Sequence, residues 1–202
     1  MKILDVNGLE IPEIKVIRFT RFRDQRGYFT EHFRESDFQT NESASKAGTV
    51  RGLHFQWNPH MGKLVRTLYG HMMDLVLDIR KGSPTFGKAI AYDMPSSRDE
   101  DFNEWIWVPP GFAHGNAYLE DSLIEYFCSG EYSPGCEAGI SPLAEDIDWT
   151  LCDQNLREAF HEIASSTPLI TDKDRNGFSV SAWERDERSD NFIYVEDGQD
   201  RG

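Results

Sequence analysis

The sequence lacks the long apolar run that a membrane-spanning helix needs, and its first residues lack the apolar stretch of a secretory signal. Cysteine is scarce. The three cysteines, Cys128, Cys136 and Cys152, are odd in number and form no CxxC pair. We therefore expect free thiols in a reducing cytosol, and a cytoplasmic protein without a membrane partner. Glycine-rich dinucleotide fingerprints are also missing, which argues against a nicotinamide cofactor.

Basic residues are outnumbered by acidic residues. The 202 residues include 21 lysines and arginines against 35 aspartates and glutamates, which gives a net charge of −14. This balance argues against nucleic acid or an anionic membrane surface as a partner. With 39% hydrophobic residues, the chain is long enough to bury a substantial core.

The last part of the chain differs in composition from the rest. Residues 183–202 are acidic and rich in turn residues, which predicts a solvated or partly ordered tail after a folded domain at residues 1–182. Within this tail, the apolar residues 192–195 are a candidate for an edge strand or for docking on a partner.

Short strand-like runs separated by turn residues dominate the first 150 residues. The pair Gly70-His71 separates two of these runs by a gap of hairpin size. Helical periodicity is scarce before residue 150, and the best helix candidate covers residues 151–163. This pattern predicts an all-β sandwich or barrel. The expected strands cover residues 16–22, 27–33, 63–69, 72–79, 87–94, 105–108, 115–118 and 123–127.

Four ordered blocks contain the residue types that carbon-acid chemistry next to a ketone needs. RGLHFQ at residues 51–56 and GKLVR at residues 62–66 place His54 and Lys63 at the starts of strands that we expect to be neighbours. A histidine can take a proton near neutral pH, and a lysine can stabilise the negative charge that then develops on oxygen. The other two blocks are VPPGFAHG, from residue 108, and TDKD, from residue 171.

Together the four blocks resemble the dTDP-4-dehydrorhamnose 3,5-epimerase family of nucleotide-sugar epimerases, over about residues 24–174. The resemblance implies an all-β fold, a cupin-like jelly-roll β-barrel with a few short C-terminal helical segments, assembled as a homodimer. It also implies inversion of carbon 3, carbon 5 or both in a nucleoside-diphosphate 4-keto-6-deoxy sugar, such as dTDP-4-dehydro-6-deoxyglucose. Such an enzyme needs no cofactor, and it serves deoxysugar or surface-polysaccharide biosynthesis.

The resemblance assigns four catalytic roles. His54 matches the base, and Asp174 matches the carboxylate that orients it. Lys63 matches the lysine that stabilises the enolate, and Tyr126 matches the proton donor. Tyr118 and Tyr132 compete for the donor role on residue type alone, but the turn that begins at Tyr132 anchors the alignment and favours Tyr126.

The resemblance also assigns a set of substrate-binding positions. The first of them lie on a segment that in the family often reaches the partner subunit, and Tyr132 falls where the family stacks an aromatic ring on the nucleobase. A diphosphate substrate fits the net charge only if cationic side chains gather at the pocket. The binding positions are Arg26, Glu31, Gln39, Asn41, Arg51, His114, Tyr132, Glu137 and Lys173.

The sequence departs from the family at several pocket positions. The segment between Phe33 and Gln39 is short, Met61 replaces a glutamine, Asn116 replaces a phenylalanine, and residues 138–145 diverge. These changes bear on the substrate more than on the reaction. The alternatives are therefore a monofunctional epimerase or ketoisomerase on another keto sugar nucleotide, or a non-catalytic sugar-nucleotide-binding cupin. A metal site is not expected, because the His-x-His pair of metal-binding cupins is missing.

Overall fold

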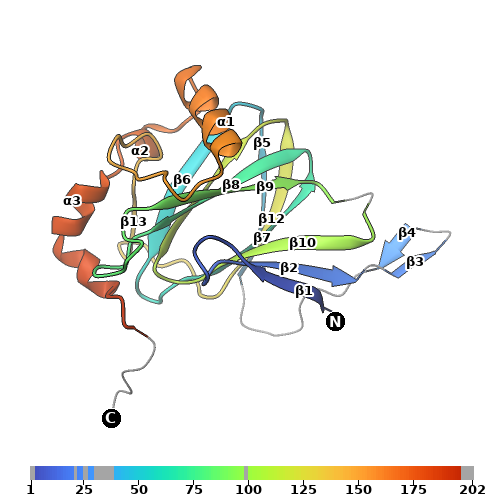
Figure 1. The fold of residues 1–202 in the computed structure, drawn as a ribbon, viewed down its shortest axis with the longest axis horizontal. Helices are drawn as coiled ribbons and strands as arrows, with labels where there is room; N and C mark the ends of the chain where they lie inside the picture. The colour runs from blue at the N-terminus through green and yellow to red at the C-terminus, as the bar shows by residue number, and fades with distance from the viewer. Residues whose placement is uncertain (1–2, 21, 25–26, 30–38, 98–99, 197–202) are drawn as a thin grey trace, which may run out of the picture.

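A computed structural model of the protein describes residues 3–20, 22–24, 27–29, 39–97 and 100–196. Figure 1 shows two β-sheets, with the helices gathered on one side of the molecule. Every strand pair within the sheets is antiparallel, so the all-β prediction is confirmed.

The larger sheet forms one wall of the candidate active site. It contains six strands in the spatial order β1 (Ile3–Gly8), β2 (Lys15–Thr20), β10 (Phe102–Val108), β7 (Lys63–Tyr69), β12 (Ser122–Cys128) and β5 (Gln39–Ser45). A separate hairpin of β3 (Phe22–Asp24) and β4 (Gly27–Phe29) extends from the body of the molecule (Figure 1).

The smaller sheet carries the opposite wall. Its five strands follow the order β13 (Glu137–Gly139), β6 (Val50–Gln56), β11 (Phe112–Tyr118), β8 (His71–Asp78) and β9 (Ala89–Pro95). β8 is buried along almost its whole length, because apolar side chains cover both of its faces.

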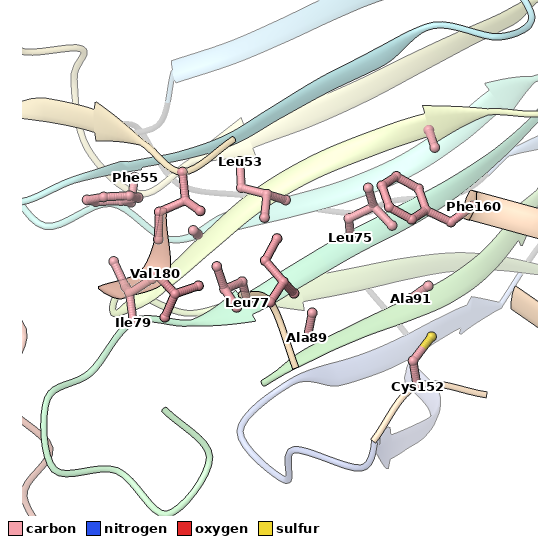
Figure 2. Close-up of a cluster of buried hydrophobic side chains, with 14 of the residues drawn as sticks. Leu53, Phe55, Leu75, Leu77, Ile79, Ala89, Ala91, Cys152, Phe160 and Val180 are labelled. Carbon is pink, nitrogen blue, oxygen red and sulfur yellow. The ribbon is translucent and has the colours of Figure 1, made fainter. Parts of the chain in front are cut away.

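Two hydrophobic clusters lie on the two faces of the smaller sheet. The inner cluster joins the sheets, since it includes Val65 and Ile106 from the larger sheet and Met72 and Val76 from β8. The outer cluster joins the smaller sheet to the helices. Figure 2 shows its side chains pointing to a common interior, among them Leu53, Phe55, Leu75, Leu77, Ala89, Ala91, Phe160 and Val180.

The helices follow β13 in the chain and cover this outer cluster. They are α1 (Gln154–Ser165), α2 (Asp172–Arg175), α3 (Val180–Arg185) and the 3-10 helix η1 (Glu187–Asn191). α1 begins after Asp153, whose carboxylate accepts hydrogen bonds from the N–H groups of Asn155 and Leu156. It buries Phe160, and it covers most of the helix predicted at residues 151–163. No helix of the described residues is both long and apolar enough to cross a membrane.

The short gap at Gly70-His71 predicts a hairpin, and this prediction is wrong. β7 pairs with β10 and β12, whereas β8 pairs with β11 and β9, so the chain passes here from one sheet to the other. The prediction that His54 and Lys63 lie on neighbouring strands is wrong for the same reason, because β6 and β7 belong to different sheets. A short gap between two strands fixes their closeness in the chain, but it does not decide which sheet each strand joins.

Two aromatic side chains anchor the described part of the segment after residue 182, residues 183–196, for which the composition predicts a solvated or partly ordered tail. Trp183 and Phe192 are buried, and both rings pack against Phe55 with centroid distances of 4.6 and 5.7 Å. Lys81 forms one parallel bridge with Ile193, which is all that the described residues show of the edge strand considered for residues 192–195. The domain boundary at residue 182 stays a prediction.

Candidate active site

A β-bulge in β6 brings two polar side chains to the same face of the smaller sheet. His54 lies opposite His114, and Arg51 lies opposite Asn116, so three steps along β6 match two steps along β11. In a regular strand, residues three apart would face opposite sides. Gly52 lies in this bulge with φ of 101°, a conformation that favours glycine. Arg51 and His54 therefore line one cavity between the sheets.

His54 is paired with Asp174, as the two sequence blocks predict. The His54 Nε2 atom lies 2.7 Å from the Asp174 Oδ1 atom, although the two residues are 120 positions apart. An ionised carboxylate only accepts hydrogen bonds, so His54 donates its Nε2–H. The other ring nitrogen, Nδ1, is then the basic one, and it has no hydrogen-bond partner among the described residues.

Several local bonds hold Asp174 in place. It belongs to α2, where its backbone N–H donates to the Thr171 side chain at 3.2 Å. The Gly52 N–H donates to the second Asp174 carboxylate oxygen at 3.3 Å. Burial acts to raise the pKa of Asp174, but the hydrogen bonds that it accepts and its electrostatic interaction with His54 outweigh burial, and the pKa is lowered. Asp174 is thus an anion that fixes the ring of His54.

The larger sheet contributes two further side chains from the opposite wall. Lys63 of β7 and Tyr126 of β12 line the same cavity as His54, and its volume is about 240 Å³. Burial lowers the pKa of the Lys63 ammonium, and nearby anionic groups, including Asp74, oppose this shift only in part. Burial raises the pKa of Tyr126, so its phenol stays protonated at neutral pH.

A second cavity of about 170 Å³ adjoins the first, because His54, Lys63 and Tyr126 line both. Asn41, Met61, Tyr132 and Glu137 are among its other lining residues. Tyr132 is 55% exposed.

Tyr132 and Lys173 both donate hydrogen bonds to the carboxylate of Glu137. The Tyr132 hydroxyl and the Lys173 ammonium each donate to Glu137 Oε1 at 2.9 Å. Burial acts to raise the pKa of Glu137, but these two bonds and the lysine charge lower it overall. Lys173 also lines a cavity of about 390 Å³ on the side of α3, and His54 and Asp174 separate that cavity from the one between the sheets.

Comparison with known proteins identifies this arrangement. A family model described as dTDP-4-dehydrorhamnose 3,5-epimerase matches residues 8–182. The protein of that name from Shigella flexneri is 35% identical over 189 residues, which cover 86% of this chain and 94% of the relative. The chain belongs to the dTDP-4-dehydrorhamnose 3,5-epimerase family.

Solved structures with the same fold include several dTDP-sugar epimerases. The dTDP-6-deoxy-D-glucose-3,5-epimerase RmlC of Legionella pneumophila, in complex with dTDP-4-keto-L-rhamnose, has a TM-score of 0.76 at 28% identity, with 95% of this chain and 98% of that chain covered. ChmJ of Streptomyces bikiniensis, a 3'-monoepimerase in complex with dTDP-quinovose, has a TM-score of 0.69 at 27% identity, with 92% and 90% covered. The prediction of a cupin-like fold is therefore confirmed.

Most of the residues that the epimerase resemblance assigns converge on the two joined cavities. Arg51 and His114 line the first cavity, and Asn41, Tyr132 and Glu137 line the second. The remaining assigned positions are less defined. Arg26 and Glu31 lie outside the described residues, and Gln39 is placed only as the backbone start of β5.

One carboxylate beside the candidate site, Asp74 of β8, was not predicted from the sequence. Asp74 is fully buried, and its Oδ2 atom lies 2.8 Å from His114 Nε2. Asn116 also donates to this oxygen, at 3.1 Å. A single acidic residue in the apolar run of residues 72–77 was the available signal, because a buried charge in a strand is paired or functional.

No cluster of three or more His, Cys, Asp or Glu side chains in the described part of the chain is arranged to hold a metal ion. His54 and His114 each bind a separate carboxylate instead. Their ring nitrogens therefore interact with Asp174 and Asp74, in contrast to the shared ligand position of a metal-binding cupin.

Proposed function

We propose that this protein epimerises a nucleoside-diphosphate 4-keto-6-deoxy sugar by removing and returning a proton at carbon 3, carbon 5 or both. One observation carries the proposal: His54 and Tyr126 line one cavity from opposite sheets. Inversion at carbon requires a base on one face of the sugar ring and an acid on the other. A ring bound between the sheets would meet His54 on one side and Tyr126 on the other.

His54 is the base in this scheme. Its Nδ1, which has no partner among the described residues, takes the proton from the carbon next to the ketone, and the electrons of the C–H bond move into an enolate. The imidazolium that forms is stabilised by Asp174, which already accepts the Nε2–H. Because Asp174 is ionised, it favours this charged state of the histidine.

Lys63 stabilises the enolate in this scheme. Its ammonium forms no ion pair within the described residues, although it lines the cavity beside the proposed base. A donor held near the ketone oxygen lowers the energy of the charge that develops there. Tyr126 then returns a proton to the opposite face, and its raised pKa keeps the phenol protonated until that step.

The adjoining cavity is the proposed nucleotide site. Tyr132 and Asn41 both line this cavity, and Tyr132, which is 55% exposed, is the aromatic residue proposed to stack on the base. We propose that Lys173 and Arg51 contact the diphosphate, with Glu137 positioning Lys173 and Tyr132. The nucleotide-binding roles of Arg26, Glu31 and Gln39, the homodimer and the cytoplasmic location belong to the same proposal.

Solvent deuterium exchange tests the activity directly. We expect the protein to incorporate deuterium from D₂O into dTDP-4-keto-6-deoxyglucose, as followed by mass spectrometry and NMR. Label at carbons 3 and 5 would indicate double epimerisation. Label at one carbon would support the monofunctional alternative, the activity for which ChmJ is named. No label in any 4-keto sugar nucleotide would refute the proposal and leave a non-catalytic binding protein.

The lowered pKa of Lys63 predicts an early loss of activity at alkaline pH. The charged form is lost as pH rises through the pKa of Lys63, so kcat/KM should fall with a midpoint below the ordinary lysine value of about 10.4. In the Lys63→Arg variant the guanidinium stays charged, and this alkaline limb should move to higher pH. Lys46→Arg, at an exposed position, should leave the profile unchanged. An alkaline limb at the same pH in all three proteins would assign it to another group.

A further inference from the structure

Two polar side chains lie next to each other on the wall of the cavity between the sheets. His114 and Asn116 are two residues apart in β11, so they point to the same face. Both are about 6% exposed, and both line the cavity of about 240 Å³ together with Lys63 and Tyr126. The proposed reaction assigns no role to Asn116.

A single carboxylate oxygen accepts a hydrogen bond from each of these two side chains. Asp74 Oδ2 accepts from His114 Nε2 at 2.8 Å and from Asn116 Nδ2 at 3.1 Å. The Asn116 amide nitrogen also lies 3.3 Å from the sulfur of Met72, a weak acceptor. Both N–H bonds of the amide are therefore used by side chains of β8.

The polar atoms that remain on these two side chains are acceptors. They are Nδ1 of His114 and Oδ1 of Asn116, and neither has a hydrogen-bond partner within the described residues. Burial lowers the pKa of His114, so its imidazole is neutral at neutral pH and its Nδ1 carries a lone pair. Lys63 on the opposite wall offers only donors, and so does Arg51, which lies beside Asn116. The two acceptors on β11 therefore lie across the cavity from the Lys63 ammonium.

A 4-keto-6-deoxyhexose matches this division. Carbon 1 carries the diphosphate, carbon 4 carries the ketone and carbon 6 is a methyl group, so only the hydroxyls on carbons 2 and 3 can donate. We infer that Asn116 is a specificity-determining residue, which together with His114 accepts hydrogen bonds from these two hydroxyls while the ketone faces Lys63. The inference rests on the proposed function. The phenylalanine that the family has at this position offers no such acceptor.

This geometry predicts selection against sugars that lack one of the hydroxyls. A missing hydroxyl would leave a buried acceptor without a partner. The binding free energy lost in this way is larger than the average net contribution of a hydrogen bond. Binding of an unreactive sugar nucleotide measures this selection without any epimerisation. The probes are dTDP-6-deoxyglucose, its 2-deoxy and 3-deoxy counterparts, and dTDP alone, titrated by calorimetry.

For the wild-type protein we expect dTDP-6-deoxyglucose to bind about 10-fold more tightly than either deoxy counterpart. Asn116→Leu keeps the size of the side chain but removes the amide oxygen. It should weaken binding of dTDP-6-deoxyglucose about 10-fold and leave one of the two deoxy counterparts unchanged. Met72→Leu is the control, because it removes only the sulfur contact of Asn116 and should preserve the wild-type ratios.

Binding of dTDP alone separates a local effect from loss of the fold. Unchanged affinity for dTDP in Asn116→Leu would show that the nucleotide site is intact. Equal wild-type affinities for all three sugar nucleotides would overturn the inference, and so would an equal weakening of all three in Asn116→Leu. Selective binding by a wild-type protein that incorporates no deuterium would refute the proposed epimerisation and still support the assignment of Asn116.

Discussion

His54→Ala is expected to lower both epimerisation and solvent deuterium exchange by about 10²–10⁴-fold, the usual loss when a positioned base is removed. Tyr126→Phe is expected to fail differently. The enolate still forms in that variant, and the His54 imidazolium can return a proton to the face from which it came. Label should then enter the substrate while the inverted product falls. The measurement is deuterium incorporation beside product stereochemistry for each variant.

The structure gives a physical reason for this difference. His54 belongs to β6 of the smaller sheet, and Tyr126 belongs to β12 of the larger sheet. Tyr126 shares neither a strand nor a hydrogen bond with the pair of His54 and Asp174, so its loss leaves the base oriented. The proposed mechanism thus assigns abstraction and delivery to separate walls of the cavity.

Matched controls lie on the surface of the same protein. His71 is also bonded to a carboxylate, Asp93, but it lies outside the cavities, so His71→Ala should keep full activity. Tyr69 is 62% exposed, and Tyr69→Phe should behave like the wild type. If Tyr126→Phe epimerises at the wild-type rate, the donor is another group, with Tyr132 or an ordered water as the next candidates. Equal loss of exchange and inversion in both site variants would assign Tyr126 a structural role.

The sequence predicted the strands whose side chains alternate or whose faces are both apolar. The run expected at residues 63–69 coincides with β7, and the run at residues 72–79 is shifted by one residue from β8. β5 was missed, because its sequence QTNESAS is polar throughout. One face of β5 borders the cavities through Asn41 and Ser43, so the strand lacks the apolar alternation on which strand prediction depends.

The site was predicted in part, and its gaps have physical causes. The pairing of His54 with Asp174 followed from two sequence blocks, and the structure joins them across 120 residues. Asp74 was missed because nothing local in the sequence shows that β8 and β11 lie side by side. Asn116 was noted as a departure from the family, but its bond to Asp74 depends on the same pairing.

The anchors of residues 183–196 could not be predicted from composition, because composition averages over the many charged residues of this segment. Its order comes from a few anchors. Trp183 and Phe192 fill the outer cluster, and the guanidinium of Arg80 lies 5.1 Å from the ring centroid of Tyr194. Composition indicates how well a segment is solvated on average, whereas two or three aromatic side chains suffice to fix its path over a hydrophobic surface.

Gly52→Ala is expected to destabilise the fold by about 2–5 kcal/mol and to abolish most of the activity, because two costs combine at this residue. A Cβ atom at Gly52 would lie 2.7 Å from Gly115 Cα and 2.7 Å from the His114 carbonyl oxygen. Both are backbone atoms of β11, so the clash cannot be relieved by turning a side chain. The φ of 101° adds the strain of a positive dihedral for a non-glycine residue. Urea unfolding and the rate of deuterium exchange measure the two effects.

Gly48→Ala separates the two costs. Gly48 also has a positive φ, 76°, but a Cβ atom there would meet nothing within 4 Å. This control should lose only about 1 kcal/mol and keep its activity, since it carries the dihedral strain without the clash. A larger loss in Gly52→Ala would then measure how closely β6 and β11 must approach for the bulge to turn Arg51 and His54 to one face. If both variants unfold at the same urea concentration and remain active, the bulge tolerates a side chain, and the common face of Arg51 and His54 does not depend on glycine.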